Sequence, residues 1–394
     1  MRIAINGAGI AGPTAAFWLS KTGHEVTIFE DAPELRSGGY IIDFWGVGYD
    51  IAERMGIVGE VRKLGYQVEE VRFVDENGNK NGGFSTGVFE RMTDGRFTSV
   101  RRSDLARTIY GALGDGVETV FDESITSIDE SETGLRAGLR NSEPREFDLV
   151  IGADGLHSKV REIAFGPQDK FEVSLGFHVA AFELEGYSPR DELVYLSHAA
   201  PGRQVSRFSM RDDKTLFLFV FRDEYLEGAD PSSEAEKKAA LREAFGDVGW
   251  ECPKILEAFE SVEEIYFDRV SQIRMEEWTK GRVALLGDAA ACVSLLAGEG
   301  TGLAMTEAYV LAGEIGRAGG DIKTAFAAYE KRLRPFLLKK QGTASKFASS
   351  FAPGTKFGIA IRNLVTRLLA IGFVADYFIG RDLRDELDLP DYGV

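Results

Sequence analysis

Residues 7–12 read Gly7-Ala8-Gly9-Ile10-Ala11-Gly12 and lie between an apolar stretch at residues 3–5 and a helix-compatible run. This order of strand, glycine turn and helix is typical of the first unit of a dinucleotide-binding fold. Gly7 permits the sharp turn, Gly9 lets the backbone approach a pyrophosphate, and Gly12 lets helix and strand pack closely. The helix N-terminus then presents free N–H groups to the phosphates. We therefore expect a dinucleotide to be bound at this turn.

A second strand is predicted at residues 25–30, and it ends in the acidic residue Glu30, 18 positions after Gly12. A carboxylate at this distance can accept hydrogen bonds from ribose hydroxyls. The βαβ unit is then complete. It leaves open whether the dinucleotide is FAD or NAD.

Length, charge and cysteine content limit the class of protein. At 394 residues the chain predicts two or three domains. Its net charge of −17 argues against nucleic acid and anionic membranes as partners. Cys252 and Cys292 are far apart in sequence, so we expect two small buried side chains, no disulfide, and a cytoplasmic location.

The apolar C-terminal stretch, residues 355–379, is interrupted by charged residues. Its longest uncharged run is eight residues, whereas crossing a bilayer takes about 20. We expect one or two helices packed on the body and no integral membrane association.

The middle of the chain predicts an inserted β domain. Strands are expected at residues 71–74 and 84–91, and long alternating runs follow at residues 176–184, 193–198, 204–210 and 215–221. Between these segments, a helix is expected from residue 101 to residue 113, with Ser103 or Asp104 as its cap. The prediction is an α/β fold with a discontinuous nucleotide-binding domain (residues 1–70, 98–167 and 276–340), a mostly antiparallel substrate-binding β domain (71–97 and 168–275) and a C-terminal helical segment (341–394).

Two further predicted strands also deliver an aspartate at their ends. Asp154 follows the strand at residues 149–152, and Asp288 follows the apolar run at residues 282–287. Because parallel strands end at one edge of a sheet, we expect both to meet the glycine turn in one crevice. Asp288 can accept hydrogen bonds from the hydroxyls of a sugar-alcohol chain. For Asp154 there is an alternative role, in which it caps the helix that follows.

A glycine-rich loop at residues 298–302 opens a long predicted helix that begins at Thr301. Its N–H groups can stabilise negative charge on a ring. A flavin has both a ribityl chain and a ring that gathers negative charge on reduction, whereas a nicotinamide dinucleotide has neither. These features favour FAD.

The order and spacing of these motifs resemble those of the class A FAD-dependent aromatic hydroxylases with the p-hydroxybenzoate hydroxylase fold. The motifs are the glycine turn with Glu30, Arg102 ahead of Asp104, the segment at residues 152–155, and the segment at residues 287–290. The resemblance runs from residue 2 to about residue 334. Around residues 38–43 the sequence is most similar to tetracycline-inactivating monooxygenases and their polyketide-tailoring relatives. The resemblance implies a Rossmann-like FAD-binding domain with an inserted, mostly antiparallel β-sheet substrate domain and C-terminal helices.

The resemblance also implies roles for individual residues. Gly7, Gly9 and Gly12 would hold the pyrophosphate, and Glu30 the adenosine ribose. Arg102 would contact the ribityl-phosphate region, Asp154 would support the cofactor and its own loop, and Asp288 would hold ribityl or pyrophosphate oxygens; Arg101 is the alternative to Arg102. The pyrimidine edge of the flavin would face Gly298, Gly300, Thr301 and Gly302, and further flavin neighbours would be Arg36 and Gly39.

The chain departs from the family pattern near the flavin. Ala291 stands where relatives usually have histidine, and Leu295 stands where they usually have proline. Glu299 stands where glutamine is frequent, which would add negative charge and disfavour an anionic reduced flavin.

The activity implied is reduction of FAD by NADH or NADPH, reaction with O2 to a flavin hydroperoxide, and hydroxylation of an aromatic or polyketide-like small molecule by a monomer or homodimer. Phe177, Phe208 and Phe219 are the predicted substrate-binding residues, although core packing is the alternative for each. No catalytic residue is assigned, because His178 and His198 are expected to be structural. Four histidines without metal-ligand spacing predict no metal site.

Two other functions remain open, a non-oxygenating FAD reductase and an FAD-containing protein that binds or sequesters a small molecule. A flavin halogenase is disfavoured because Trp18, Trp45, Trp250 and Trp278 do not cluster in the sequence. A monooxygenase with two dinucleotide sites is disfavoured because a second GxGxxG is absent.

Overall fold

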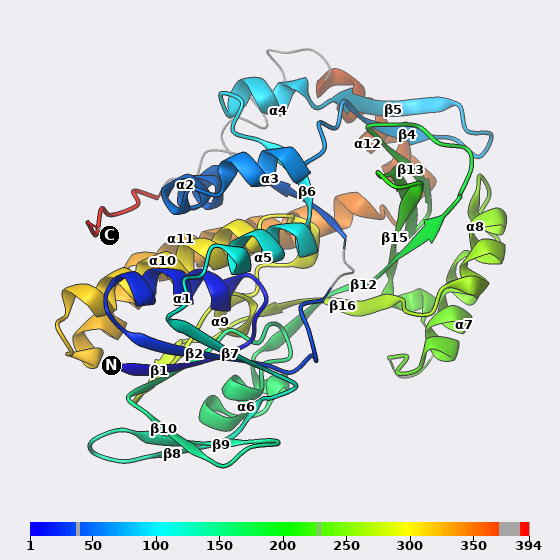
Figure 1. Ribbon diagram of the computed structural model, residues 1–394. Coiled ribbons are helices and arrows are strands. Elements are labelled where there is room, and N and C mark those ends of the chain that lie inside the picture. Colours follow the sequence, from blue (N-terminus) through cyan, green and yellow to red (C-terminus); the bar gives the residue numbers. More distant parts are fainter. Residues whose placement is uncertain (37–39, 227, 229, 370–386, 394) are drawn as a thin grey trace.

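The computed structural model describes residues 1–36, 40–226, 228, 230–369 and 387–393. One half is built on a six-stranded sheet of order β17-β18-β11-β1-β2-β7, parallel except for the β17–β18 pair (Figure 1). Its strands are β1 (Arg2–Asn6), β2 (Glu25–Glu30), β7 (Val117–Phe121), β11 (Leu149–Gly152), β17 (Thr279–Lys280) and β18 (Val283–Leu285). The central strands are short and almost wholly apolar, because both faces of a parallel sheet are covered.

Helices and a small sheet enclose this half. The helices are α1 (Ala11–Lys21), α2 (Gly46–Met55), α3 (Val58–Leu64), α5 (Arg102–Gly111), α6 (Lys159–Phe165), α9 (Asp288–Ala291), α10 (Gly300–Arg317) and α11 (Ile322–Phe351). In Figure 1, α1, α10 and α11 lie side by side, and α10 packs against α1, α2 and α11. The small sheet contains β8 (Ile125–Glu130), β9 (Leu135–Leu139) and β10 (Arg145–Phe147).

The other half is a seven-stranded sheet of order β16-β12-β15-β14-β13-β4-β5, in which β13 and β4 are parallel and the other pairs antiparallel. Its strands are β4 (Glu70–Val74), β5 (Lys80–Ser85), β12 (Glu172–Glu185), β13 (Val194–Ala200), β14 (Arg203–Ser209), β15 (Lys214–Arg222) and β16 (Tyr266–Ile273). Helices α7 (Glu234–Phe245) and α8 (Cys252–Ala258) lie along its outer side in Figure 1, and α12 (Lys356–Leu369) packs on β5.

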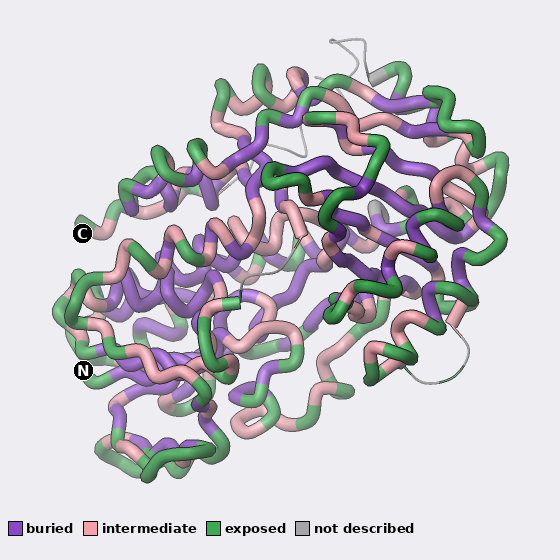
Figure 2. Tube along the Cα trace, turned by 45° about the vertical axis from the view of Figure 1, so that its right-hand side comes forward, coloured by how far each residue is buried: buried purple, intermediate pink, exposed green. Residues whose placement is uncertain are grey.

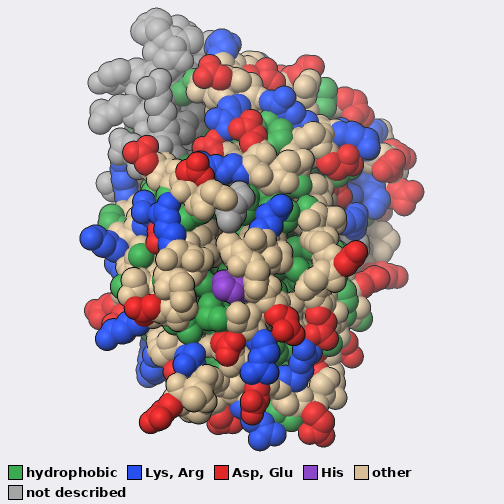
Figure 3. Space-filling model, turned by 60° about the vertical axis from the view of Figure 1, so that its left-hand side comes forward, with side chains coloured by type: hydrophobic (Ala, Val, Ile, Leu, Met, Phe, Trp, Pro, Cys, Tyr) green, Lys and Arg blue, Asp and Glu red, His purple; other side chains and the backbone are tan. Residues whose placement is uncertain are grey.

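Strands β3 (Ile41–Phe44) and β6 (Thr98–Arg101) form a separate, two-stranded antiparallel sheet. Figure 2 shows buried residues running through the interior of both halves, with exposed residues on the outer loops and outer helix faces. On the face in Figure 3, basic side chains are interspersed among acidic ones. None of the described helices is long and apolar enough to cross a membrane.

Two local predictions were wrong. Residues 84–91 are not a strand, because β5 ends at Ser85 and α4 (Gly87–Met92) follows it. The Phe89 ring stacks on Phe97 at 5.5 Å, so tertiary packing decides the conformation of this short apolar run. Neither Ser103 nor Asp104 caps α5, since β6 runs directly into the helix and its N-cap is Arg101. The predicted boundary at residues 340 and 341 falls inside α11.

Candidate functional site

The three motif-bearing strands end side by side, as the sequence predicts. β11 is paired with β1 on one edge and with β18 on the other, and the register aligns Asn6 with Gly152 and Gly152 with Leu285. The glycine turn, the loop that carries Asp154 and the turn before Asp288 therefore leave the sheet at one edge. This is the edge at which open α/β sheets bind ligands.

The glycines of the turn have different local roles. Gly7 has φ +111°, and a Cβ on it would lie 2.5 Å from the carbonyl oxygen of Ala153, while a Cβ on Gly12 would overlap the carbonyl oxygen of Gly7. A Cβ on Gly9 would meet nothing nearer than the Arg102 Nη2 atom, at 3.8 Å. Gly7 and Gly12 are thus needed for packing, whereas Gly9 borders open space beneath a guanidinium. The N-cap residue of α1, Ile10, makes no side-chain cap, so the first N–H groups face that space.

Glu30 stands at the end of β2 and holds the same turn. Its Oε2 accepts the N–H of Ala8 at 2.6 Å, and its Oε1 accepts the N–H of Ala32 at 3.0 Å. Because each carboxylate oxygen has two acceptor sites, both oxygens can also accept a ligand hydroxyl.

The side chains of the two arginines at the β6–α5 junction, Arg101 and Arg102, contact different parts of the protein. Arg102 extends toward Gly9, and its N–H donates to the carbonyl of Tyr40 at 3.1 Å. Arg101 instead forms an ion pair with Glu183 of β12 at 2.5 Å. The structure therefore places Arg102, not Arg101, at the glycine turn. Arg36 is exposed, and Gly39 lies outside the described residues.

Asp154 is fully engaged by its own loop and neighbouring strand. It accepts from Asn6 Nδ2 at 3.0 Å, from the Ser158 hydroxyl, and from the N–H groups of Lys159 at 2.8 Å and Val160 at 3.1 Å. These contacts join β1 to the start of α6. The N-cap residue of α6 is Ser158, whose hydroxyl accepts the N–H of Arg161, so Asp154 is not itself the cap. Asp154 supports the loop and accepts the first two N–H groups of the helix.

Asp288 begins α9 directly after Gly287, which has φ +59°. It is partly exposed, and a Cβ on Gly300 would lie 3.8 Å from its Oδ1, so the carboxylate faces the first turn of α10. The α10 N-terminus has no side-chain cap, which leaves the N–H groups of its first turn, including that of Thr301, available. Asp288 and these N–H groups can hold polar atoms of one ligand.

The remaining glycines of this loop shape it. Gly298 has φ +69° and ends the 3-10 turn Leu295–Ala297. Gly302 lies against Gly48 of α2, where a Cβ on Gly302 would be 3.4 Å from the Gly48 Cα. Gly302 therefore provides for close helix packing in addition to any contact with a ligand.

Glu299, which the sequence predicts to add negative charge near the flavin, is paired with a cation. Its Oε2 is 2.7 Å from Lys340 Nζ of α11. The ion pair offsets the charge that the sequence pattern adds.

Sequence reasoning missed Glu307, a buried residue of α10. Its Oε2 accepts the N–H of Gly287 at 2.8 Å and lies 3.3 Å from the Tyr329 hydroxyl. Burial raises the pKa of the Glu307 carboxyl to about 8. The signal in the sequence was an acidic residue within an otherwise apolar helical run.

A cavity of about 1120 Å³ adjoins the crevice at residues 295–299. It lies among the seven-stranded sheet, β3, α11 and α12, and apolar side chains make up most of its wall. Its aromatic lining residues are Tyr40, Trp45, Phe73, Phe84, Phe89, Phe97, Tyr195, Phe208, Phe336 and Phe351. This volume and lining suit a multi-ring small molecule.

Of the three predicted substrate-binding phenylalanines, Phe208 lines the cavity and the other two do not. Phe219 packs with Phe245 against the α7 and α8 layer, and Phe177 packs beneath the end of α11 beside Ala348. The reason is the two-residue period of strands: on β15, Phe219 faces the helices while Leu218 faces the cavity. Phe177 and Phe219 are therefore corrected to core residues.

Asp43 of β3 lines the cavity and accepts from the Ser99 hydroxyl. Burial raises its pKa. The sequence used this residue as part of a resemblance and did not identify it as an acid that faces the cavity.

The histidines that the sequence considered lie against other groups of the protein. His178 is buried between Asp223, at 3.0 Å, and Asp230, at 2.9 Å. His198 Nδ1 lies 3.1 Å from the carbonyl oxygen of Val74. Both cysteines are buried and unpaired, and the described residues contain no cluster of metal-ligating side chains.

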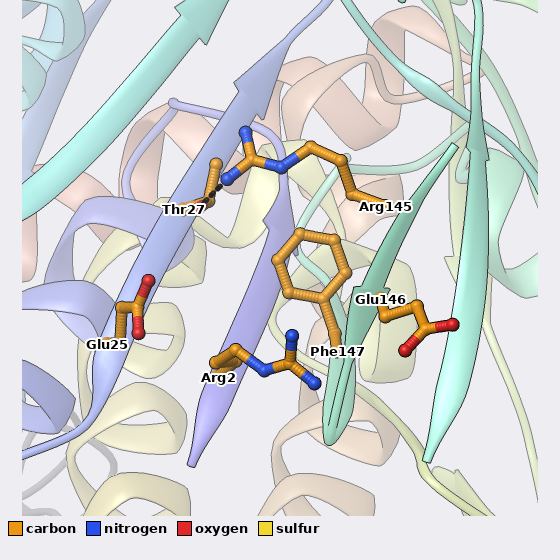
Figure 4. A pocket seen from close by; sticks show the side chains of 6 residues that line it. All are labelled: Arg2, Glu25, Thr27, Arg145, Glu146 and Phe147. Carbon is orange, nitrogen blue, oxygen red and sulfur yellow. Dashed lines mark hydrogen bonds between the residues drawn. The ribbon is translucent and has the colours of Figure 1, made fainter. Parts of the chain in front are cut away.

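A second hollow, of about 250 Å³, lies at the opposite end of the six-stranded sheet (Figure 4). It is lined by Arg2, Glu25, Thr27, Arg145, Glu146 and Phe147. Arg145 is paired with Glu118 at 2.7 Å and donates to Thr27 at 3.3 Å. Because it lies at the amino ends of β1 and β2, away from the three motifs, we assign it no role in the site.

Comparison with known proteins gives a consistent result. A family described as FAD binding domain matches residues 1–330. An uncharacterized protein of Mycobacterium tuberculosis is 36% identical over 89% of this chain and 94% of its own length. A protein named flavin-dependent monooxygenase, from an unknown prokaryotic organism, is 33% identical over 89% of this chain and 90% of its own. The crystal structure of tetracycline destructase Tet(51) superposes with a TM-score of 0.83 and 31% identity, over 99% of both chains.

Proposed function

This chain belongs to the FAD-binding-domain family of class A flavin-dependent monooxygenases, and from that premise we propose that it uses NADH or NADPH and O2 to hydroxylate an aromatic or polyketide-like small molecule. The alternatives are a non-oxygenating FAD reductase and an FAD-containing binding protein.

The groups along this edge of the sheet support the proposal of FAD as the cofactor. The space before Gly9, the N-terminus of α1 and the Arg102 guanidinium suit a pyrophosphate, and Glu30 suits a ribose. Asp288 would hold ribityl hydroxyls, and the first turn of α10 would face the ring. We propose that these groups bind the cofactor directly, while Asp154 and Gly302 keep the surrounding loops in place.

When bound, FAD supplies the electron transfer and oxygen activation that amino-acid side chains lack. The protein would contribute by positioning the substrate and by limiting its contact with water. The apolar cavity would orient the substrate toward residues 295–299 and exclude water from it. Asp43 would place a carboxyl group against a polar atom of the substrate, because it lines the cavity.

One observation carries the proposal: the large aromatic-lined cavity reaches the loop that begins α10, next to Asp288. A non-oxygenating FAD reductase does not require an apolar cavity of this size beside the cofactor ring, whereas a small-molecule binding protein would also use one and is distinguished by the experiment below. The size of the cavity and the relative named tetracycline destructase support a polycyclic substrate.

The experiment is to purify the protein, measure bound FAD by absorbance, and screen polycyclic phenols and polyketides for stimulated NADH and NADPH oxidation. With ¹⁸O2, mass spectrometry should detect a product that has gained one labelled oxygen. A protein that cannot be loaded with FAD would contradict the proposal. Stimulated oxidation without a labelled product would favour the reductase, and tight FAD binding without stimulation would favour the binding protein.

A further inference from the structure

Arg362 of α12 reaches into the cavity wall from the C-terminal part of the chain. Its guanidinium lies 4.0 Å from the centre of the Phe73 ring. Residue 362 is partly buried, although α12 also carries several exposed apolar side chains, of which Ile361 and Val365 line the same cavity. The helix thus places a cation at the edge of an apolar space.

Within the part of the chain that the structure describes, the hydrogen-bond partners of this guanidinium are neutral. Nη1 donates to Gln204 Oε1 at 2.7 Å and to the carbonyl oxygen of Phe351 at 3.0 Å, and Nε and Nη2 donate to Asn363 Oδ1 at 3.2 and 3.1 Å. Among the described residues, no carboxylate lies within ion-pair distance of Arg362. Burial lowers the pKa of Arg362 to about 10, which leaves it charged at neutral pH.

Three other cations of the cavity lining, Lys340, Arg332 and Arg207, differ from Arg362 because they have carboxylate partners. Lys340 pairs with Glu299 at 2.7 Å, and Arg332 pairs with Glu314 at 3.4 Å. Arg207 pairs with Asp191 at 2.6 Å and with Glu251 at 3.0 Å. A half-buried cation without a counter-ion is costly, so its charge is available to a ligand.

Polar side chains extend from Arg362 along the sheet. Gln204 Nε2 donates to the Ser206 hydroxyl at 3.4 Å, and that hydroxyl is 2.8 Å from the hydroxyl of Ser197. Gln204, Ser206 and Ser197 are buried and line the cavity, and we call them the polar strip. The strip provides hydrogen-bonding groups beside the cation within an otherwise apolar wall.

Asp43 and Arg362 mark different regions of the cavity. Arg362 contacts Gln204, which is paired with Ala199 of β13. Asp43 accepts from Ser99, and Tyr66, the bridge partner of Ser99, contacts Phe208, which is paired with Tyr195 of the same strand. Four residues of strand correspond to roughly 13 Å. A ligand that reaches both regions must be elongated.

We propose that Arg362 and the polar strip bind a negatively charged oxygen group of the substrate, a carboxylate or an ionised enol or phenol, at the end of the cavity away from Asp43. This inference rests on the proposed function and narrows its substrate class to elongated anionic polycycles. In a chain of net charge −17, which repels anions at long range, the local cation would make this preference a property of the cavity.

The test is calorimetric binding of two isosteric tricyclic probes, anthraquinone-2-carboxylate and anthraquinone-2-carboxamide, to the FAD-loaded protein. The wild type is expected to bind the carboxylate at least tenfold more tightly than the carboxamide. R362Q should reduce this ratio to within twofold and leave the carboxamide affinity within threefold of the wild type. R362K should keep part of the preference. The matched control is R367Q on the same helix, because Arg367 is exposed and donates to Asn81 at 3.0 Å.

Equal binding of the two probes by the wild type, tighter binding of the carboxamide, or an unchanged ratio in R362Q would overturn the inference. The ratio of the carboxylate and carboxamide affinities of the wild type tests the inference even if R362Q does not fold. FAD content is measured on the same samples. A protein that holds FAD and prefers the neutral probe contradicts this inference alone, whereas a protein that cannot hold FAD contradicts the proposed function.

Discussion

The carboxylate of Glu307 accepts the backbone N–H of Gly287 at 2.8 Å, directly behind Asp288. A buried acid of α10 thereby fixes the turn that presents Asp288 to the crevice. The pKa of Glu307 is raised to about 8 from 4.5 by burial, so the folded protein keeps this carboxyl protonated at pH values at which the unfolded chain has lost the proton.

This shift predicts a pH-dependent stability. Between about pH 4.5 and pH 8 the folded state binds the extra proton, so the Glu307 contribution to the free energy of unfolding is greatest at low pH and falls as pH rises. E307Q resembles the protonated form of Glu307. Between pH 5 and pH 8.5, its free energy of unfolding should therefore fall less than that of the wild type. The difference between the two decreases should be a few kcal/mol, because one pKa unit corresponds to about 1.4 kcal/mol. Urea unfolding from pH 5 to pH 8.5 measures this. Parallel curves for the two proteins would contradict it.

A second variant separates charge from the hydrogen bond. E307L removes the acceptor of the Gly287 N–H and should cost about 1–3 kcal/mol in unfolding free energy near pH 5, where E307Q should cost little.

Gly9 and Gly12 should respond differently to alanine. A Cβ on Gly12 overlaps the carbonyl oxygen of Gly7, so G12A should lower the unfolding free energy by about 1–3 kcal/mol. A Cβ on Gly9 has room in the protein, so G9A should leave the melting temperature of the FAD-free protein nearly unchanged and weaken FAD binding at least tenfold. Thermal melts and FAD titration are the measurements. FAD affinity unchanged in G9A would show that the pyrophosphate does not approach this residue.

Asp288 and Asp154 form a matched pair with opposite expectations. D288A should weaken FAD binding about tenfold or more with little change in the stability of the FAD-free protein, because the carboxylate faces the crevice. D154A should instead cost about 0.5–2 kcal/mol of stability, because it removes the groups that hold the start of α6. FAD titration and urea unfolding of both variants test this. If D288A retains full FAD occupancy at limiting FAD, the role proposed for Asp288 is wrong.

The variants F208A and F219A test which of these two phenylalanines borders the substrate cavity. F219A opens a cavity in the packed layer beneath α7 and α8 and should cost about 3–5 kcal/mol. F208A enlarges a space that is already open on one side, so it should cost less stability and change KM more than F219A does. Urea unfolding and steady-state kinetics compare the two. An equal loss of stability with no change in KM for F208A would place Phe208 in the core as well.

Local patterns were sufficient for the strands and the glycine turn of the nucleotide-binding half. The apolar runs of β1, β2 and β11 and the glycine spacing depend on neighbours in sequence, because a parallel strand covered on both faces is apolar throughout. Their meeting at one edge followed from parallel pairing. The helix α4 and the cap of α5 were misjudged because packing of Phe89 on Phe97 and the direct β6–α5 junction involve contacts that a short window does not contain.

The sequence by itself determined the glycine turn, the two aspartates at strand ends and the family, since each depends on residue type at fixed spacing. Tertiary structure alone decided which arginine of the pair at residues 101 and 102 faces the turn, because adjacent side chains diverge at a strand-to-helix junction. It also decided which face of β15 borders the cavity, since alternation defines two faces without saying what covers either. Glu307, and Arg362 with the role proposed for it, could be recognised only in the fold. Burial, and the absence of a counter-ion among the described residues, depend on surroundings drawn from distant parts of the chain.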